Sequence, residues 1–167
     1  MEAVERRPLY RCIFNNARHY SQGAAFLYEN IFNGARNADF IAPGVLCSTF
    51  CIELLLKCLV LIRHEDIFTK DDVRKKGIEF DKHKYSELFA IIAPDLQDRV
   101  VHTFNEQFGE SISKQDYIKL LKKLGDNGFV EWRYVYETDQ QKHLDVKLQN
   151  KITDSLGKCI ESVLKEK

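Results

Sequence analysis

The chain has few of the residues that interrupt helices, with only three prolines and eight glycines among its 167 residues. Glycine and proline are frequent turn-forming residues, and a fold of many short strands needs many turns. The composition therefore leaves little room for a many-turned β fold and favours long helices. A chain of this length can bury a sizeable core, and we predict a single domain over residues 1–167.

The chain also lacks an excess of charge of either sign. Lysine and arginine together number 25, as do aspartate and glutamate, so the formal net charge at pH 7 is zero. A protein without net positive charge has no overall field that holds nucleic acid non-specifically. Any nucleic-acid site must therefore be a local patch.

Several signatures of function are missing. The sequence contains no glycine-rich phosphate loop, no G-x-S-x-G motif and no H-E-x-x-H motif. Its five cysteines lack the paired short spacings of a zinc site, so we expect reduced structural thiols and predict no metal and no cofactor. The N-terminal segment MEAVERRPLY carries charges and has no apolar core, unlike a secretory signal, so we predict a soluble, cytoplasmic protein.

One long apolar run is present, from Val45 to Ile62, and it reads VLCSTFCIELLLKCLVLI. As a helix it is about 27 Å long at roughly 1.5 Å per residue, and because it is apolar on nearly every face we expect other helices to surround it. Glu53 and Lys57 interrupt the run four residues apart, so they share one helix face. Charges are costly inside a membrane, which argues against a membrane span. Inside a protein these two charges must be paired or hydrogen-bonded.

Helical spacing of apolar residues continues through most of the chain, with caps and breakers at the expected ends. We predict a helix from near Pro8 to about Asn33, a loop over 34–42 and a central helix opening at Pro43. Two short helices follow, one capped by Thr69 and ending at Gly77 and one over 83–92. The remaining predicted helices cover 94–108, 113–124 and about 141–165. The segment FVEWRYVYE at 129–137 has strand-like residues but no partner strand, so we predict an extended or partly helical bridge. The predicted fold is all-α, an up-and-down helical bundle of four main helices plus two or three short ones.

The candidate site combines charged and aromatic residues from three parts of the chain. These residues are Glu53, Lys57, His83, Arg133, Tyr134, Tyr136 and Glu137. Arginine commonly grips phosphate and tyrosine stacks on bases, so the set indicates a nucleotide or RNA ligand. The structural alternative is that Glu53 neutralises Arg133 inside the bundle and fixes the register of the helices.

Three short blocks of sequence carry a resemblance to a known family. They are CIELLLKCL in the central helix, HKYSELF before a short helix, and RYVYE before the last helix. With this helix order, the chain resembles the HEPN domain, over roughly residues 17–163. The resemblance implies an all-α bundle that is often a homodimer. Many HEPN proteins are metal-independent ribonucleases that act as toxins beside an antitoxin or in anti-phage defence, and others are non-catalytic and bind nucleotides or partner proteins.

The ribonuclease signature of the family is an arginine with a histidine four to six residues later. No arginine in this chain has a histidine at that spacing. We therefore expect a non-catalytic module that binds RNA, a nucleotide or a partner protein. One alternative is a rearranged ribonuclease site in which His83 is the acid or base, Arg133 clamps the phosphate, and Glu137 orients His83 or acts as a base. Another is a structural dimer subunit of a larger assembly. The predictions are that Glu53, His83, Arg133 and Glu137 converge on one cleft and that the protein is a homodimer.

Overall fold

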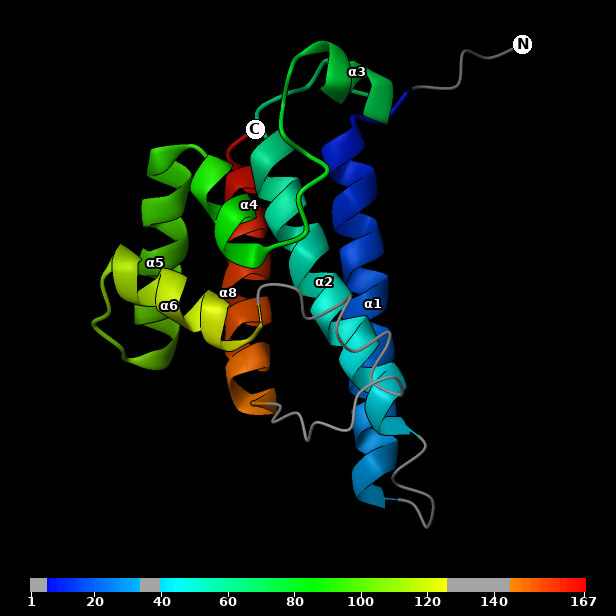
Figure 1. Ribbon diagram of the computed structural model, residues 1–167, viewed down its shortest axis with the longest axis vertical. Helices are drawn as coiled ribbons and strands as arrows, with labels where there is room; N and C mark the ends of the chain where they lie inside the picture. Colours follow the sequence, from blue (N-terminus) through cyan, green and yellow to red (C-terminus); the bar gives the residue numbers. More distant parts are fainter. Residues whose placement is uncertain (1–5, 34–39, 126–144) are drawn as a thin grey trace.

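The computed structural model describes residues 6–33, 40–125 and 145–167 (Figure 1). All regular structure in these residues is helical, as the composition predicts. The four long helices are α1 (Leu9–Asn33), α2 (Ile41–Leu61), α5 (Pro94–Phe108) and α8 (Val146–Lys165). The three short helices are α3 (Lys70–Lys75), α4 (Tyr85–Ile91) and α6 (Lys114–Lys123). The predicted all-α bundle of four main helices with short additions is therefore confirmed for the described part of the chain.

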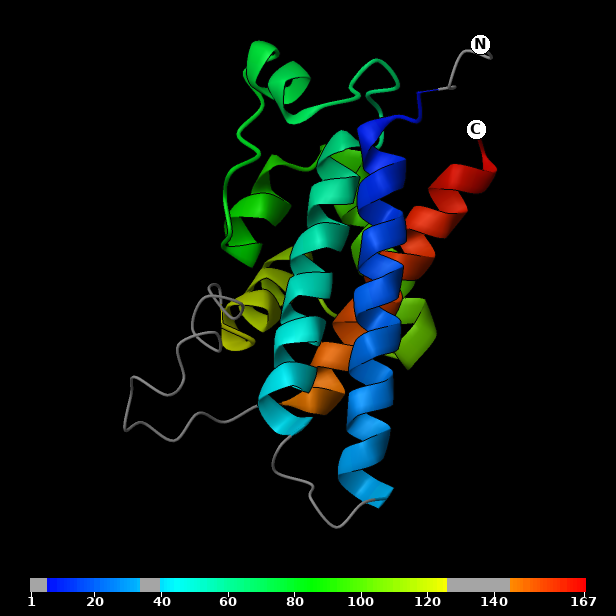
Figure 2. The same cartoon turned by 90° about the vertical axis from the view of Figure 1, so that its right-hand side faces the viewer.

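Helix α2 lies at the centre of the bundle, as its apolar sequence predicts. It packs against α1 along most of its length and contacts α8 and α4 on other sides. Figures 1 and 2 show α1 and α2 as an antiparallel pair. In Figure 1, α8 lies beside α2 on the side away from α1, with α5 and α6 farther out, and in Figure 2 α8 crosses behind the pair. Residues from Cys51 to Leu61 on α2 are nearly all buried, so this helix supplies the middle of the hydrophobic core.

The paired helices α1 and α2 approach each other closely at Gly44. A Cβ atom built on Gly44 would lie 3.0 Å from a ring carbon of Tyr28, which leaves little space for any larger residue. The Tyr28 hydroxyl lies 2.9 Å from Ser48 Oγ and donates to Gln149 Oε1 at 3.3 Å. One tyrosine therefore joins α1, α2 and α8 near the start of α8, and these hydrogen bonds satisfy its half-buried hydroxyl.

Caps and breakers set most helix ends where the sequence predicts them. Thr69 and Ser113 each form a complete capping box, with Asp72 and Asp116 as the respective reciprocal partners. Gly109 ends α5 with φ of +64°, a left-handed conformation that favours glycine. These caps and breakers act within a few residues, so they set where each helix begins or ends independently of long-range packing.

Two predicted boundaries are wrong by about two residues. Helix α2 begins at Ile41 and not at Pro43, because a proline within the first turn removes only an N–H group that has no partner inside the helix. Helix α4 begins at Tyr85, so His83 precedes the helix and does not open it. The last helix starts at Val146 after the cap residue Asp145, and the part of the prediction before 145 lies outside the described residues.

Helix α2 is also the one helix in the described residues that is long and apolar enough to cross a membrane. However, 72% of its most apolar window is buried inside the bundle. Other helices cover the apolar faces of α2, which is typical of the core helix of a helical bundle.

Candidate functional site

The structure places both Lys57 and His83 in direct contact with Glu53. Glu53 Oε1 lies 2.9 Å from Lys57 Nζ, one helical turn along α2, and 3.0 Å from His83 Nδ1. The Glu53 side chain is 2% exposed, whereas the His83 side chain is 55% exposed. The cluster therefore extends from the buried interior of the bundle to its surface.

Glu53 fixes the orientation of the His83 ring. An ionised carboxylate can only accept hydrogen bonds, so the short contact places a proton on Nδ1 of His83. In a neutral imidazole this tautomer leaves a lone pair on Nε2. In the described part of the chain, Nε2 has no hydrogen-bond partner. As in other carboxylate–histidine pairs, the carboxylate contacts one ring nitrogen and leaves the other free to accept a proton.

Lys57 balances the buried charge of Glu53. The Lys57 ammonium group also lies 5.1 Å from the centre of the Phe80 ring, within the range of a cation–π contact. The second oxygen of Glu53, Oε2, is buried and has no hydrogen-bond partner among the described residues. The carboxylate therefore makes both of its contacts through Oε1.

The other predicted site residues lie in a part of the chain that the structure does not describe. Arg133, Tyr134, Tyr136 and Glu137 all fall within 126–144. The proposed pairing of Glu53 with Arg133 and the role of Glu137 stay predictions. In the described residues, Glu53 makes the orienting contact with His83 that the sequence-based mechanism assigned to Glu137.

A second group of residues was missed by the sequence reasoning. Arg7 precedes α1, and Arg11 and Arg18 lie on it, with spacings of four and seven residues that place them along one side. None of the three forms an ion pair with a described carboxylate. The described arginines on other elements do form such pairs, namely Arg63 with Asp95, Arg74 with Asp71, and Arg99 with Glu166.

The signal for this group was present in the sequence. The only acidic residue in α1 is Glu29, which lies far along the helix from Arg11 and Arg18. No acid therefore occupies a position three or four residues from either arginine within the helix. Arg11 donates from Nε to the Tyr10 hydroxyl at 3.3 Å, and its guanidinium carbon lies 5.6 Å from the centre of the Tyr10 ring, but it forms no ion pair with a described residue.

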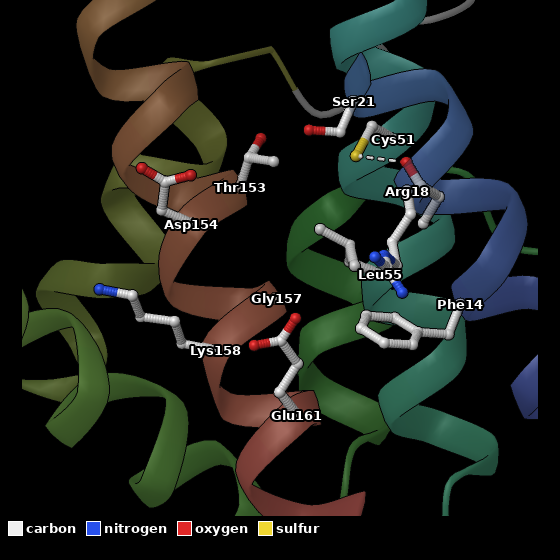
Figure 3. Close-up of a pocket in the computed structure, with 11 residues that line it drawn as sticks. Phe14, Arg18, Ser21, Cys51, Leu55, Thr153, Asp154, Gly157, Lys158 and Glu161 are labelled. Atoms are coloured by element: carbon white, nitrogen blue, oxygen red, sulfur yellow. Dashed lines mark hydrogen bonds between the residues drawn. The ribbon is translucent and has the colours of Figure 1, made fainter. Parts of the chain in front are cut away.

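The arginines adjoin a groove between α1 and α8, which we call the α1–α8 groove. Its walls include Phe14, Arg18 and Ser21 from α1 and Thr153, Gly157 and Glu161 from α8, and its floor is Cys51 and Leu55 of α2 (Figure 3). This part of the groove has a volume of about 190 Å³. It continues into a hollow of about 370 Å³ near Tyr28 and Asn150. A further hollow of about 280 Å³ lies beside Arg7 and Arg11.

The groove and the Glu53 cluster lie on opposite sides of α2. Cys51 and Leu55 are four residues apart and face the groove, whereas Glu53 and Lys57 are four residues apart on another face. A shift of two residues rotates the side chain by about 200° around the helix axis at 3.6 residues per turn. The two places are therefore separate candidate sites.

The groove contains no activated thiol. Cys51 on the floor donates a hydrogen bond from Sγ to the carbonyl oxygen of Ala17 at 3.2 Å, and burial raises its pKa to about 12. A thiol with that pKa is fully protonated at neutral pH and is a poor nucleophile. Desolvation at the groove wall also raises the pKa of Asp154, and this effect is opposed by the nearby charge of Lys158.

Comparisons with known proteins give no relative for this chain. No family model matches it, and neither the curated proteins nor the solved structures contain a significant match. The resemblance to the HEPN domain therefore stays a prediction. Within residues 6–33, 40–125 and 145–167, no group of three or more histidine, cysteine, aspartate or glutamate side chains is placed to hold a metal ion.

Proposed function

We propose that the protein is a HEPN-like helical module that binds RNA or nucleotides through phosphate contacts from Arg7, Arg11 and Arg18. The supporting observation is that these arginines form no ion pair with a described carboxylate, whereas Arg63, Arg74 and Arg99 are ion-paired. An arginine without an internal partner can bind phosphate without first breaking an ion pair. Because the net charge of the chain is zero, a nucleic-acid site must be a local cluster of positive charge, and these three arginines form such a cluster.

The spacing of the arginines suits a short length of single-stranded RNA. Arg11 and Arg18 are about 10 Å apart along α1 at roughly 1.5 Å per residue. That distance is about three stacked nucleotides at roughly 3.4 Å per nucleotide. Arg7 extends the row beyond the start of the helix, and Asn15 and His19 lie between or beside the arginines and offer further polar contacts.

The salt dependence of RNA binding tests this proposal. We would measure the affinity of a fluorescent single-stranded RNA over a range of salt concentrations, comparing wild type with the double variant Arg11→Ala/Arg18→Ala. Loss of two phosphate contacts on a single strand is expected to reduce the slope of log K against log salt by about 1.4. The control, Arg74→Ala/Lys75→Ala on α3, removes the same charge from another surface. Equal slopes for the two double variants would contradict the proposal.

A second candidate function is metal-independent RNA cleavage at His83. The supporting observation is the 3.0 Å contact from Glu53, which leaves Nε2 of His83 available as a base. In such a reaction Nε2 takes the proton of a ribose 2′-hydroxyl while the 2′-oxygen attacks phosphorus, and the 5′-oxygen leaves with a proton from water. Arg133 is the sequence-based candidate for the phosphate clamp.

RNA cleavage in EDTA separates the two functions. Wild type would be compared with His83→Ala and Arg133→Ala, with the fold of each checked by circular dichroism. Cleavage that both folded variants lose would establish the reaction. Absence of cleavage by wild type over a range of RNAs would leave the binding function alone.

We also propose that the protein forms a homodimer. Phe26 on α1 is 65% exposed, and Tyr20 and Ile41 are each about two-fifths exposed. All three lie on α1 or α2, and large exposed apolar side chains are a feature of surfaces that another chain covers. Light scattering of wild type and Phe26→Ser tests this, with a dimer expected for wild type and a larger monomer fraction for the variant. A monomeric wild type would refute it.

A further inference from the structure

A glycine in the α1–α8 groove has no role in packing the described fold. Gly157 lies in the middle of α8, where glycine is less favourable than alanine because it loses more backbone freedom on folding. A Cβ atom built at this position meets nothing within 4 Å. Gly44 is different, because a close neighbour limits the size of its side chain. The described residues around Gly157 therefore give no steric reason for glycine there.

The position of Gly157 supplies a different reason. Gly157 lines the wall of the groove between Thr153 and Glu161, opposite Phe14 and Arg18. Since nothing blocks a side chain there, a large one would extend into the groove and reduce its volume. The glycine keeps this part of the groove open for a molecule that approaches the backbone of α8.

The chemistry of the walls indicates what that molecule is. Figure 3 shows the side chains of Arg18 from α1 and Glu161 from α8 at the space between the two helices. Arg18, Glu161, Ser21 and Thr153 have no side-chain hydrogen bond or ion pair with any described residue, so their polar groups are available to a ligand. The Phe14 side chain and the floor beside it are apolar and mostly buried.

We propose that the groove binds a nucleoside phosphate, with the base against the apolar floor and Phe14, the phosphate on Arg18, and a hydrogen-bond donor of the base or ribose on Glu161. A flat, partly apolar body suits a narrow slot with an apolar floor. A phosphate suits Arg18 because Arg11 and Arg7 continue the positive row away from the groove. The inference rests on the proposed function, since it assigns the base pocket next to the phosphate-binding arginines.

The ligand is either a free nucleotide or the terminal nucleotide of an RNA chain. Both present the same chemistry to the groove. Competition with three RNA oligomers distinguishes the sources. All three oligomers compete for Arg18 through their phosphates. If RNA ends enter the groove, a 5′-phosphorylated or 3′-phosphorylated oligomer displaces a bound nucleoside monophosphate at lower concentration than a circular oligomer of the same sequence does. If only free nucleotides enter, the three oligomers displace the monophosphate equally.

The main test is calorimetric titration with the four nucleoside monophosphates and with ribose 5-phosphate, which lacks the base. Gly157→Leu is expected to weaken binding of the preferred monophosphate by about tenfold or more, the range of a lost base contact. Gly157→Ala is the matched control and is expected to bind as wild type does, since a methyl group adds little bulk. Arg18→Ala is expected to weaken the binding of both nucleotide and ribose 5-phosphate.

Three other results of these titrations would overturn the base pocket. Equal affinities for monophosphates and ribose 5-phosphate, unchanged by Gly157→Leu, would overturn the pocket and leave the phosphate-binding arginines intact. Absence of any nucleotide and RNA binding by wild type would overturn the proposed function as well. If Gly157→Leu does not fold, Ser21→Leu narrows the same groove from α1 and takes its place. Retention of full monophosphate affinity by folded Ser21→Leu would then overturn the pocket.

Discussion

Removing the Glu53 carboxylate should reveal how strongly the bundle depends on its buried ion pair. Glu53 and Lys57 are 2% and 8% exposed, and their contact is 2.9 Å. In Glu53→Leu the Lys57 ammonium keeps its position in the core but loses the carboxylate that neutralises it. Breaking a buried pair from one side typically costs about 3–5 kcal/mol. That is a large fraction of the roughly 5–15 kcal/mol by which domains are usually stable.

The double variant Glu53→Leu/Lys57→Met separates the cost of an unpaired charge from the value of the pair. Replacing a buried pair with apolar residues of similar size is often neutral or stabilising, because the desolvation of both ions is no longer needed. We expect the double variant to be within about 1 kcal/mol of wild type or more stable. The single variants should therefore be strongly non-additive, and urea unfolding followed by circular dichroism would measure the coupling.

The exposed pair Arg74–Asp71 is the matched control for this cycle. Its side chains are 65% and 75% exposed, so its coupling should be close to zero. If the double variant at Glu53 and Lys57 loses the sum of the two single losses, the reasoning from burial is wrong. If it is stable but loses a measured RNA activity, then Glu53 has a functional role through His83 besides its structural one.

Two further predictions concern titration and thiol chemistry. The hydrogen bond from Lys119, followed by that from Ser113, lowers the pKa of Asp116 to about 2, below its usual value near 3.9. The ionised Asp116 carboxylate therefore stabilises the fold above about pH 4, and this contribution is lost as the pH falls toward about 2. The difference in the free energy of unfolding between wild type and Asp116→Asn, measured by urea unfolding, should disappear over that range. Burial raises the pKa of both Cys51 and Cys58 to about 12, and a thiol reagent should modify exposed Cys12 well before either of them, as mass spectrometry of peptides would show. Rapid labelling of Cys51 in the folded protein would contradict its buried position.

The helices could be predicted because their signals are local. Pro94, Gly109 and the Ser113 cap act within a few residues of each helix end, and the structure places the ends of α5 and the start of α6 at these residues. The errors at Pro43 and His83 arose where a local signal permitted more than one boundary. A proline is tolerated anywhere in the first turn, and a histidine before a helix has no cap role that fixes its place.

The candidate sites depend on contacts that no local signal reports. His83 reaches Glu53 across 30 residues of sequence, and the residue types could be predicted but not which acid orients the ring. Arg18 has no acid three or four residues away in its own helix, and Glu161 of α8, across the groove, forms no ion pair with it. Gly157 faces an open groove because of the way α1 and α8 both pack on α2, and no local signal reports this packing.

The sequence by itself determined the class of fold and the burial of α2, because apolar periodicity and helix caps act through the backbone and the hydrophobic effect over short distances. It also determined that Glu53 and Lys57 share a face, since helix geometry alone requires it. Only the tertiary structure decided that His83 completes this cluster and that the α1 arginines adjoin a groove on the other side of α2. These features arise from the relative placement of helices far apart in sequence, which is set by the packing of many side chains together.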